Sequence, residues 1–216
     1  MQLQYRPVQG FNSPLELLRT EPVAFVLLAI AIILALSLHE YAHALAADLQ
    51  GDRMPRAMGR VSLNPARHLD PLGTLLIFLV GFGWGKPVEF RLQALSSQRF
   101  GAAIVALAGP MMNLFLGFLG VLGIAWGLAD SGALFTFFVT FFHINVTLAV
   151  LNLIPVPPLD GSRLLTIFLP PSKQHILFFL DRYGIFILLI LLLFGGQILL
   201  LPMIEAVERF IAGLVL

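Results

Sequence analysis

Two histidines and a glutamate interrupt a long apolar stretch near the start of the chain. The motif reads His39-Glu40-Tyr41-Ala42-His43, and residues 22–38 before it are almost entirely apolar. On a helix, side chains at positions i and i+4 share a face, so both imidazoles can bind one ion while Glu40 handles a proton beside them. Polar groups at membrane depth are costly and usually functional. The motif predicts a zinc site with hydrolytic chemistry inside a bilayer.

A catalytic zinc ion needs a third protein ligand and an open position for water. Asp160 is the best candidate, because three prolines, at positions 155, 157 and 158, end the preceding helix and force an extended segment. Such a segment can carry a carboxylate back toward the histidines, and Gly161 permits close backbone approach after it. The chain has no cysteine, which excludes thiolate ligands and disulfides. We therefore expect one catalytic Zn2+ with two imidazole ligands and one carboxylate ligand.

The composition is that of a membrane protein. Of 216 residues, 58% are hydrophobic and only 12% are charged, and the mean hydropathy is +0.91. Soluble domains carry about 25% charged residues, so this deficit is too large for a soluble chain of this length. We predict an all-α polytopic membrane protein that forms a single domain over residues 1–216, with a core at 21–165 and C-terminal helices at 175–216. The net charge of +1 gives no reason to expect a nucleic acid partner.

Four segments are long and apolar enough to cross a bilayer, which requires roughly 20 residues. They cover residues 21–47, 101–128, 133–154 and 184–201. Residues 72–80 are apolar but too short to span at about 1.5 Å per residue, so a re-entrant segment is expected there. In residues 204–216 apolar and charged positions alternate with helical spacing, which suits an interfacial helix.

The longest polar region, residues 48–100, separates the first two predicted spans. It contains two short strand-like pieces at residues 59–63 and 86–90, set among glycines and prolines. The distribution of Lys and Arg indicates whether residues 72–80 span the membrane or re-enter it from one side. If residues 72–80 are re-entrant, ten of the 13 basic residues lie on one side, but if they span, the division is eight against five. The positive-inside rule favours the re-entrant arrangement, with the histidine motif and Asp160 both toward the cytoplasm.

Several motifs in this order resemble one known family. They are the histidine motif, residues 63–65 (Leu-Asn-Pro), 68–71 (His-Leu-Asp-Pro), 83–88 (Gly-Trp-Gly-Lys-Pro-Val), 108–113 (Ala-Gly-Pro-Met-Met-Asn) and 152–161. Together, over roughly residues 37–165, they strongly resemble the site-2 protease family of intramembrane zinc metalloproteases. The resemblance implies that His39, His43 and Asp160 bind zinc, that Glu40 is the general base, and that Asn152 lies beside the site. The chain is similar to short members of the family, without PDZ or CBS domains.

The resemblance implies an endopeptidase that cuts transmembrane segments of membrane proteins, in regulated proteolysis or membrane-protein turnover. Its expected location is a prokaryotic cytoplasmic membrane, with the active site toward the cytoplasm. One alternative is another HExxH peptidase with a distal glutamate ligand, for which Glu89 and Glu205 are available. A second alternative is a non-proteolytic zinc-binding or transport protein. Transport favours ligands on several helices and inverted repeats, whereas this chain has no repeat.

The remaining buried-type polar residues have simpler expected roles. Asn113 is expected to satisfy backbone groups freed by Pro110 or to pack near the ligand helix. Asn145 and His143 are expected to make hydrogen bonds inside the bundle, and His68 to stabilise a loop.

Overall fold

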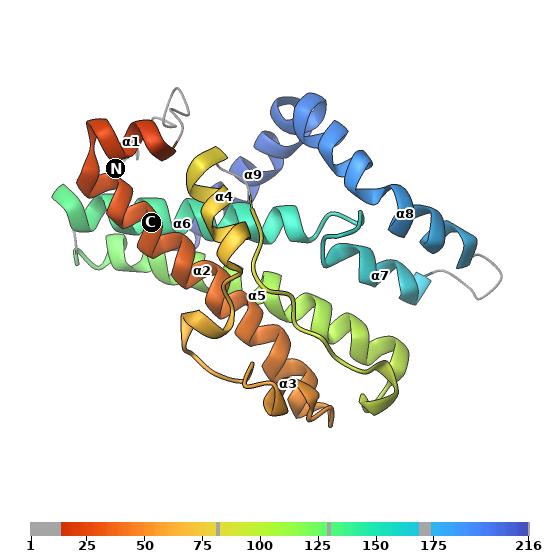
Figure 1. The fold of residues 1–216 in the computed structure, drawn as a ribbon. Helices are drawn as coiled ribbons and strands as arrows, with labels where there is room; N and C mark the ends of the chain where they lie inside the picture. Colours follow the sequence, from red (N-terminus) through yellow and green to blue (C-terminus); the bar gives the residue numbers. More distant parts are fainter. Residues whose placement is uncertain (1–13, 81–82, 129–130, 169–173, 216) are drawn as a thin grey trace.

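The computed structural model describes residues 14–80, 83–128, 131–168 and 174–215, and the fold in these ranges is helical (Figure 1). Four helical segments are long and apolar enough to cross a membrane: α2 (Pro22–Leu49), α5 (Gln98–Ala125), α6 (Gly132–Asn152) and a run from Phe178 to Gly213. The run joins α8 (Gln174–Ile190), the π-helical segment η4 (Leu191–Leu200) and α9 (Leu201–Gly213). Each of the four predicted spans lies in one of these segments, although the fourth segment extends well beyond the predicted 184–201, and the chain is an integral membrane protein.

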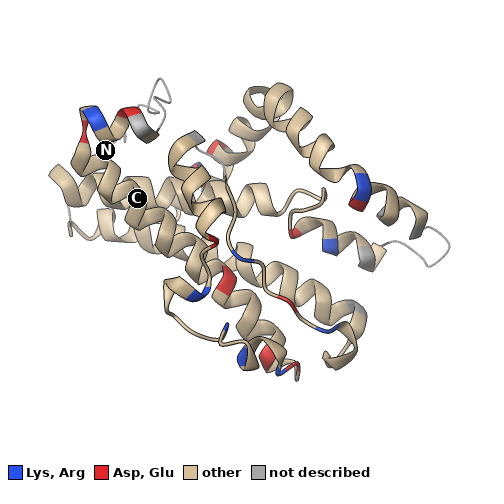
Figure 2. Cartoon of the chain, viewed as in Figure 1, with Lys and Arg blue, Asp and Glu red and all other residues tan. Residues whose placement is uncertain are grey.

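Helices α2, α5 and α6 pack against one another and form the centre of the molecule. Helix α5 runs antiparallel to α2 and is followed by α6 (Figure 1). Three glycines on one side of α5, Gly117, Gly120 and Gly123, lie against Phe138, Phe142 and Val146 of α6. Without side chains at these glycines the two helices can approach closely, which is how helices commonly associate in membranes. Charged residues are few along these helices and are more frequent in the irregular chain that follows α2 (Figure 2).

The region between α2 and α5 is mostly irregular. It contains α3 (Met54–Ala57), η1 (Pro65–Arg67), α4 (Pro71–Val80) and η2 (Leu92–Ala94). The strands predicted at residues 59–63 and 86–90 are not formed, and among the described residues of this region one isolated antiparallel bridge pairs Leu69 with Gly85. The reason is that side chains, not a strand ladder, satisfy much of the backbone here: a guanidinium bonds the carbonyls of residues 67 and 86, and a histidine ring bonds that of residue 62.

Buried carboxylates fasten this region to the end of α2. Asp48 accepts hydrogen bonds from Arg53 and Arg56 at 2.7–3.0 Å. Asp52, which is fully buried, accepts from the backbone and the guanidinium of Arg91 and from the Met54 amide. Burial raises the pKa of Asp52, but these donors outweigh it and lower the pKa overall. The irregular chain is thereby held beside the histidine motif.

The C-terminal helix differs from the prediction of an interfacial helix. Ile204 and Ile211 of α9 are buried in a cluster with valines of α5 and α6, and Glu208 bonds His143 of α6 at 2.6 Å. The sequence pattern identified Ile204 and Ile211 as part of the apolar face, and these residues pack on the helix bundle, but Leu214 is exposed and Glu208, expected on the polar side, is buried. Glu208 can lie on the buried side because His143 satisfies it.

Candidate active site

Helix α2 carries both histidines of the motif on its buried face. His39 and His43 are 5% and 6% exposed. His39 Nδ1 lies 2.6 Å from Asn113 Oδ1, and His43 Nδ1 lies 2.6 Å from the backbone oxygen of Val105. A carbonyl oxygen can only accept, so each Nδ1 is the protonated nitrogen. The unprotonated Nε2 atoms of both rings therefore carry the lone pairs available to a metal.

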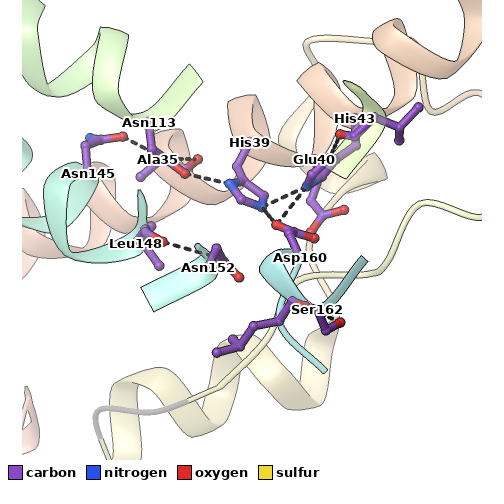
Figure 3. Close-up of polar contacts among 12 residues, drawn as sticks. Ala35, His39, Glu40, His43, Asn113, Asn145, Leu148, Asn152, Asp160 and Ser162 are labelled. Carbon is purple, nitrogen blue, oxygen red and sulfur yellow. Dashed lines mark hydrogen bonds and ion pairs between the residues drawn. The ribbon is translucent and has the colours of Figure 1, made fainter. Parts of the chain in front are cut away.

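Asp160 brings the third polar atom to this point. Helix α6 ends at Asn152, and the proline-containing segment after it returns the chain so that Asp160 precedes α7 (Gly161–Phe168). Asp160 Oδ2 lies 3.1 Å from His39 Nε2 and 3.2 Å from His43 Nε2, and the two nitrogens are 3.0 Å apart (Figure 3). The sequence predicted that these three residues share one site, and in the structure their side chains converge.

This triangle of atoms fits zinc. With both Nδ1 atoms protonated, the three converging atoms are all acceptors, and acceptors at 3 Å need a cation between them. Tetrahedral zinc with bonds of about 2.0–2.2 Å separates its ligand atoms by about 3.3 Å. The three residues form the candidate metal-binding group in the part of the chain that the structure describes. Two imidazoles and a carboxylate are a donor set that zinc prefers.

Glu40 projects beside this group, on the same side as Asp160 (Figure 3). Its side chain is 13% exposed, and Arg60 Nη2 lies 3.7 Å from its Oε2 atom. Gly85 is also close, since a Cβ atom at this position would lie 3.3 Å from Oε1 of Glu40. The carboxylate is thus adjacent to the ligand group and held from the side by the irregular region.

Asn113 packs near the ligand helix, as one of its two expected roles stated, but its bond to His39 was not predicted from the sequence. Its Oδ1 accepts from His39, while its Nδ2 donates to Asn145 Oδ1 at 2.8 Å and to the Ala35 oxygen at 3.3 Å. Asn145 Nδ2 in turn donates to the Phe141 oxygen, so the donor and the acceptor are fixed for each of these hydrogen bonds. The two amides, both fully buried, set the tautomer and orientation of the His39 ring.

Gly109 is a second residue whose contact with the imidazoles was not predicted from the sequence. A Cβ atom at this position would lie 2.4 Å from His43 Nε2 and 2.7 Å from His39 Nε2. No side chain fits there without moving both rings. A signal was present in the sequence: Val105, Gly109 and Asn113 are spaced by four, as the histidines are, and so share one face of α5.

Asn152 stays a prediction. Its Nδ2 donates to the Leu148 oxygen of its own helix at 3.1 Å, a bond that does not involve the ligand group (Figure 3). His143 bonds Glu208, and the fully buried His68 bonds the Ser62 oxygen, so both make the structural contacts expected of them. Neither Glu89 nor Glu205 belongs to the described metal-binding group.

An Asn113→Leu variant is expected to bind zinc about 10- to 100-fold more weakly, the usual effect of losing a partner that orients a ligand. The leucine leaves His39 Nδ1 without an acceptor in a buried site. Competition with a chelator measures the affinity. Thr147→Val is the control, because it removes a buried hydroxyl without a hydrogen-bond partner among the described residues. Equal zinc affinity in Asn113→Leu and the wild type would contradict the orienting role.

Comparison with known proteins identifies the family. Residues 119–194 match the description "Peptidase family M50". A Bacillus subtilis protein named "Putative zinc metalloprotease YwhC" is 37% identical over 188 residues, which cover 83% of this chain and 86% of the relative. Proteins named "Putative zinc metalloprotease Rip2" from Mycolicibacterium smegmatis and Mycobacterium tuberculosis are 34% and 31% identical, over 78% of this chain and 67% of each relative. No solved structure matches the chain. Since the first relative aligns over most of both lengths, this chain belongs to peptidase family M50, the site-2 protease family.

Proposed function

We propose that this protein is a zinc-dependent intramembrane endopeptidase that hydrolyses peptide bonds in transmembrane segments of membrane proteins. The observation that carries the proposal is the convergence of three acceptor atoms within a bundle of apolar helices, with a carboxylate next to them. In this proposal His39, His43 and Asp160 hold the metal and Glu40 is the general base. The test is cleavage of a single-span reporter by the purified protein and by its Glu40→Gln variant.

The chemistry divides between the ion and the chain. When bound, zinc supplies a Lewis acid that polarises the scissile carbonyl and lowers the pKa of water toward about 7. Glu40 accepts the proton of the attacking water and returns it to the leaving amine. Asn113 and the Val105 carbonyl keep both imidazoles in their binding orientation throughout. Asn152 donates to the oxyanion that develops, once its amide leaves the Leu148 oxygen.

A helical substrate must unwind before hydrolysis, because its carbonyls are engaged in its own hydrogen bonds. We propose that residues 59–63 and 86–90 hold the unwound segment extended by pairing with its backbone. Residues 86–90 are irregular and directly follow Gly85, which lies next to Glu40. The backbone hydrogen bonds described at this stretch are made at its ends, by Lys86 and Arg91, which leaves room for pairing between them.

Proline at position 88 tests this substrate contact. Val88→Pro removes one backbone donor, so we expect cleavage to fall about tenfold, the effect of losing about 1.4 kcal/mol of hydrogen bonding, with zinc retained. Val88→Ala is the matched control, since it shortens the side chain and keeps the N–H group. Cleavage at the wild-type rate by Val88→Pro would rule out pairing at this position.

The same region bears on the orientation in the membrane. We propose that α4 enters and leaves the bilayer on one side and that the active site faces the cytoplasm in a bacterial cytoplasmic membrane. The Leu69–Gly85 bridge supports this arrangement, because it joins the residues just before and just after the α4 excursion. Gly83 also lies against Gly73 near the start of α4, so the described chain after α4 is again beside the first turn of that helix. The distribution of basic residues, ten against three, points the same way.

A further inference from the structure

Arg60 is a buried cation whose position the hydrolytic chemistry does not yet explain. It lies in the irregular region between α3 and η1, and it is only 3% exposed. Burying a guanidinium costs several kcal/mol unless its donors are satisfied and a negative charge lies nearby. Burial lowers the pKa of Arg60, which the carboxylates of Glu40 and Glu89 oppose. The group stays charged, because arginine is not deprotonated in proteins.

The guanidinium is fixed through two backbone carbonyls. Nη1 donates to the Arg67 oxygen at 2.7 Å, and Nη2 donates to the Lys86 oxygen. These carbonyls belong to the two segments that meet at the Leu69–Gly85 bridge, where the Lys86 amide also donates to the His68 oxygen. Arg60 therefore joins the two segments, and the charged end cannot shift without breaking both of its anchors.

The same nitrogen faces Glu40 without making a hydrogen bond to it. Nη2 lies 3.7 Å from Oε2 of Glu40, which is within ion-pair range but beyond a hydrogen bond. The other buried carboxylates of this region are bonded directly by arginines: Asp48 accepts at 2.7–3.0 Å from two of them, and Asp52 accepts from Arg91. Those carboxylates each accept three or more hydrogen bonds. Glu40 has a cation beside it and keeps its lone pairs for water.

Resting on the function proposed above, we propose that Arg60 is the positioning residue for Glu40. A fixed positive charge lies beside Oε2 of Glu40 and the Gly85 backbone lies beside Oε1, so both oxygens of the carboxylate have a neighbour in the irregular region next to the ligand group. Because its hydrogen bonds to the two carbonyls fix the guanidinium in place, it attracts the carboxylate electrostatically without forming a hydrogen bond to it. The proton-accepting oxygens then meet the attacking water in a constant geometry, on which rate depends strongly.

Kinetics of Arg60 variants test this role against a purely structural one. For Arg60→Gln we expect kcat to fall about 10²-fold, KM to change less than about twofold, and zinc content to equal that of the wild type. Arg60→Lys keeps the charge but cannot reproduce the planar fork, so its kcat is expected to lie between those of Arg60→Gln and the wild type. Arg209→Gln is the matched control, since Arg209 is an exposed arginine of α9 that bonds the Glu205 oxygen of its own helix, and its loss should leave kcat unchanged.

A second measurement keeps the test decisive if Arg60→Gln folds poorly. In a Glu40→Asp background the carboxylate is already displaced, so a positioning residue should have much less left to lose. We expect Arg60→Lys to lower kcat by a smaller factor there than in the wild type, which is non-additive behaviour. Equal factors in the two backgrounds would mean that Arg60 does not act through Glu40.

Other outcomes overturn the inference. Wild-type kcat in Arg60→Gln, or a loss expressed only in KM, would show that Arg60 merely supports the substrate-binding segments. Loss of zinc from the same variant would assign it to the metal site. Failure of the proposed function is a separate result, because it appears as a wild-type protein that does not cleave or as a Glu40→Gln variant that does.

Discussion

The Glu40→Gln variant is expected to bind zinc as the wild type does and to cleave a transmembrane reporter about 10²- to 10⁴-fold more slowly, the usual contribution of a general base. Glutamine has the size of glutamate and can occupy the same space beside Arg60 and Gly85. Its amide cannot accept the proton of the attacking water. None of the atoms that converge on the metal position belongs to Glu40, so the affinity for zinc should not change.

The measurement pairs reporter cleavage in lipid vesicles with zinc content per chain. Glu208→Gln is the matched control, because Glu208 is also a buried carboxylate in an apolar helix, and a glutamine there can still bond His143. We expect this control to cleave at the wild-type rate. Cleavage by Glu40→Gln at that rate would refute the assignment of the base. Loss of zinc from Glu40→Gln would instead make Glu40 part of the metal site.

The Asp160→Ala variant is expected to lose both zinc and cleavage. Removing the carboxylate leaves two neutral imidazoles to hold a divalent ion and takes away the one negative charge among the converging atoms. Partners that only orient a ligand are worth about 10- to 100-fold in affinity, so losing a ligand should weaken binding by more than about 100-fold. Chelator competition followed by elemental analysis measures the loss.

Asp181→Ala is the control for this experiment, because Asp181 lies on the exposed side of α8 and does not belong to the metal-binding group. It should keep its zinc through the same competition. Full zinc occupancy in Asp160→Ala would contradict the proposed ligand set. That result would favour a distal glutamate, Glu89 or Glu205, as the third ligand.

Features with a local cause could be predicted from the sequence. Apolar length specifies the four spans, because the bilayer sets the number of residues required. The four-residue spacing places His39 and His43 on one helix face, and the prolines after Asn152 explain how Asp160 can return to them. Each of these inferences depends on a short piece of chain and on one rigid geometric rule.

Features that depend on how helices meet could not be predicted in the same way. Asn113 and Gly109 contact the imidazoles because of the register between α2 and α5. Their spacing of four shows that they share a face of α5, but it does not show that this face meets the histidines. The strands expected at 59–63 and 86–90 are absent, and side chains bond the backbone there instead, above all Arg60. Such side-chain bonds can join residues that are distant in the sequence. Part of the apolar face of α9 was recognisable, but not whether protein or lipid covers it.

The face of α5 that meets the histidines has a wider consequence. At intervals of four residues, this face presents a hydrogen-bond acceptor (the Val105 carbonyl), a position without a side chain (Gly109) and a second acceptor (Asn113 Oδ1). The two imidazoles opposite them are also four residues apart, on an antiparallel helix. The site therefore depends on two sequence patterns: the histidine ligands on α2 and, on α5, a complementary template of residues that orient them. A template of this kind can be searched for in other apolar sequences. It can also be introduced into a designed pair of antiparallel helices. An i, i+4 histidine pair that lacks such a template would have rings free to turn, and so would make a poor zinc site.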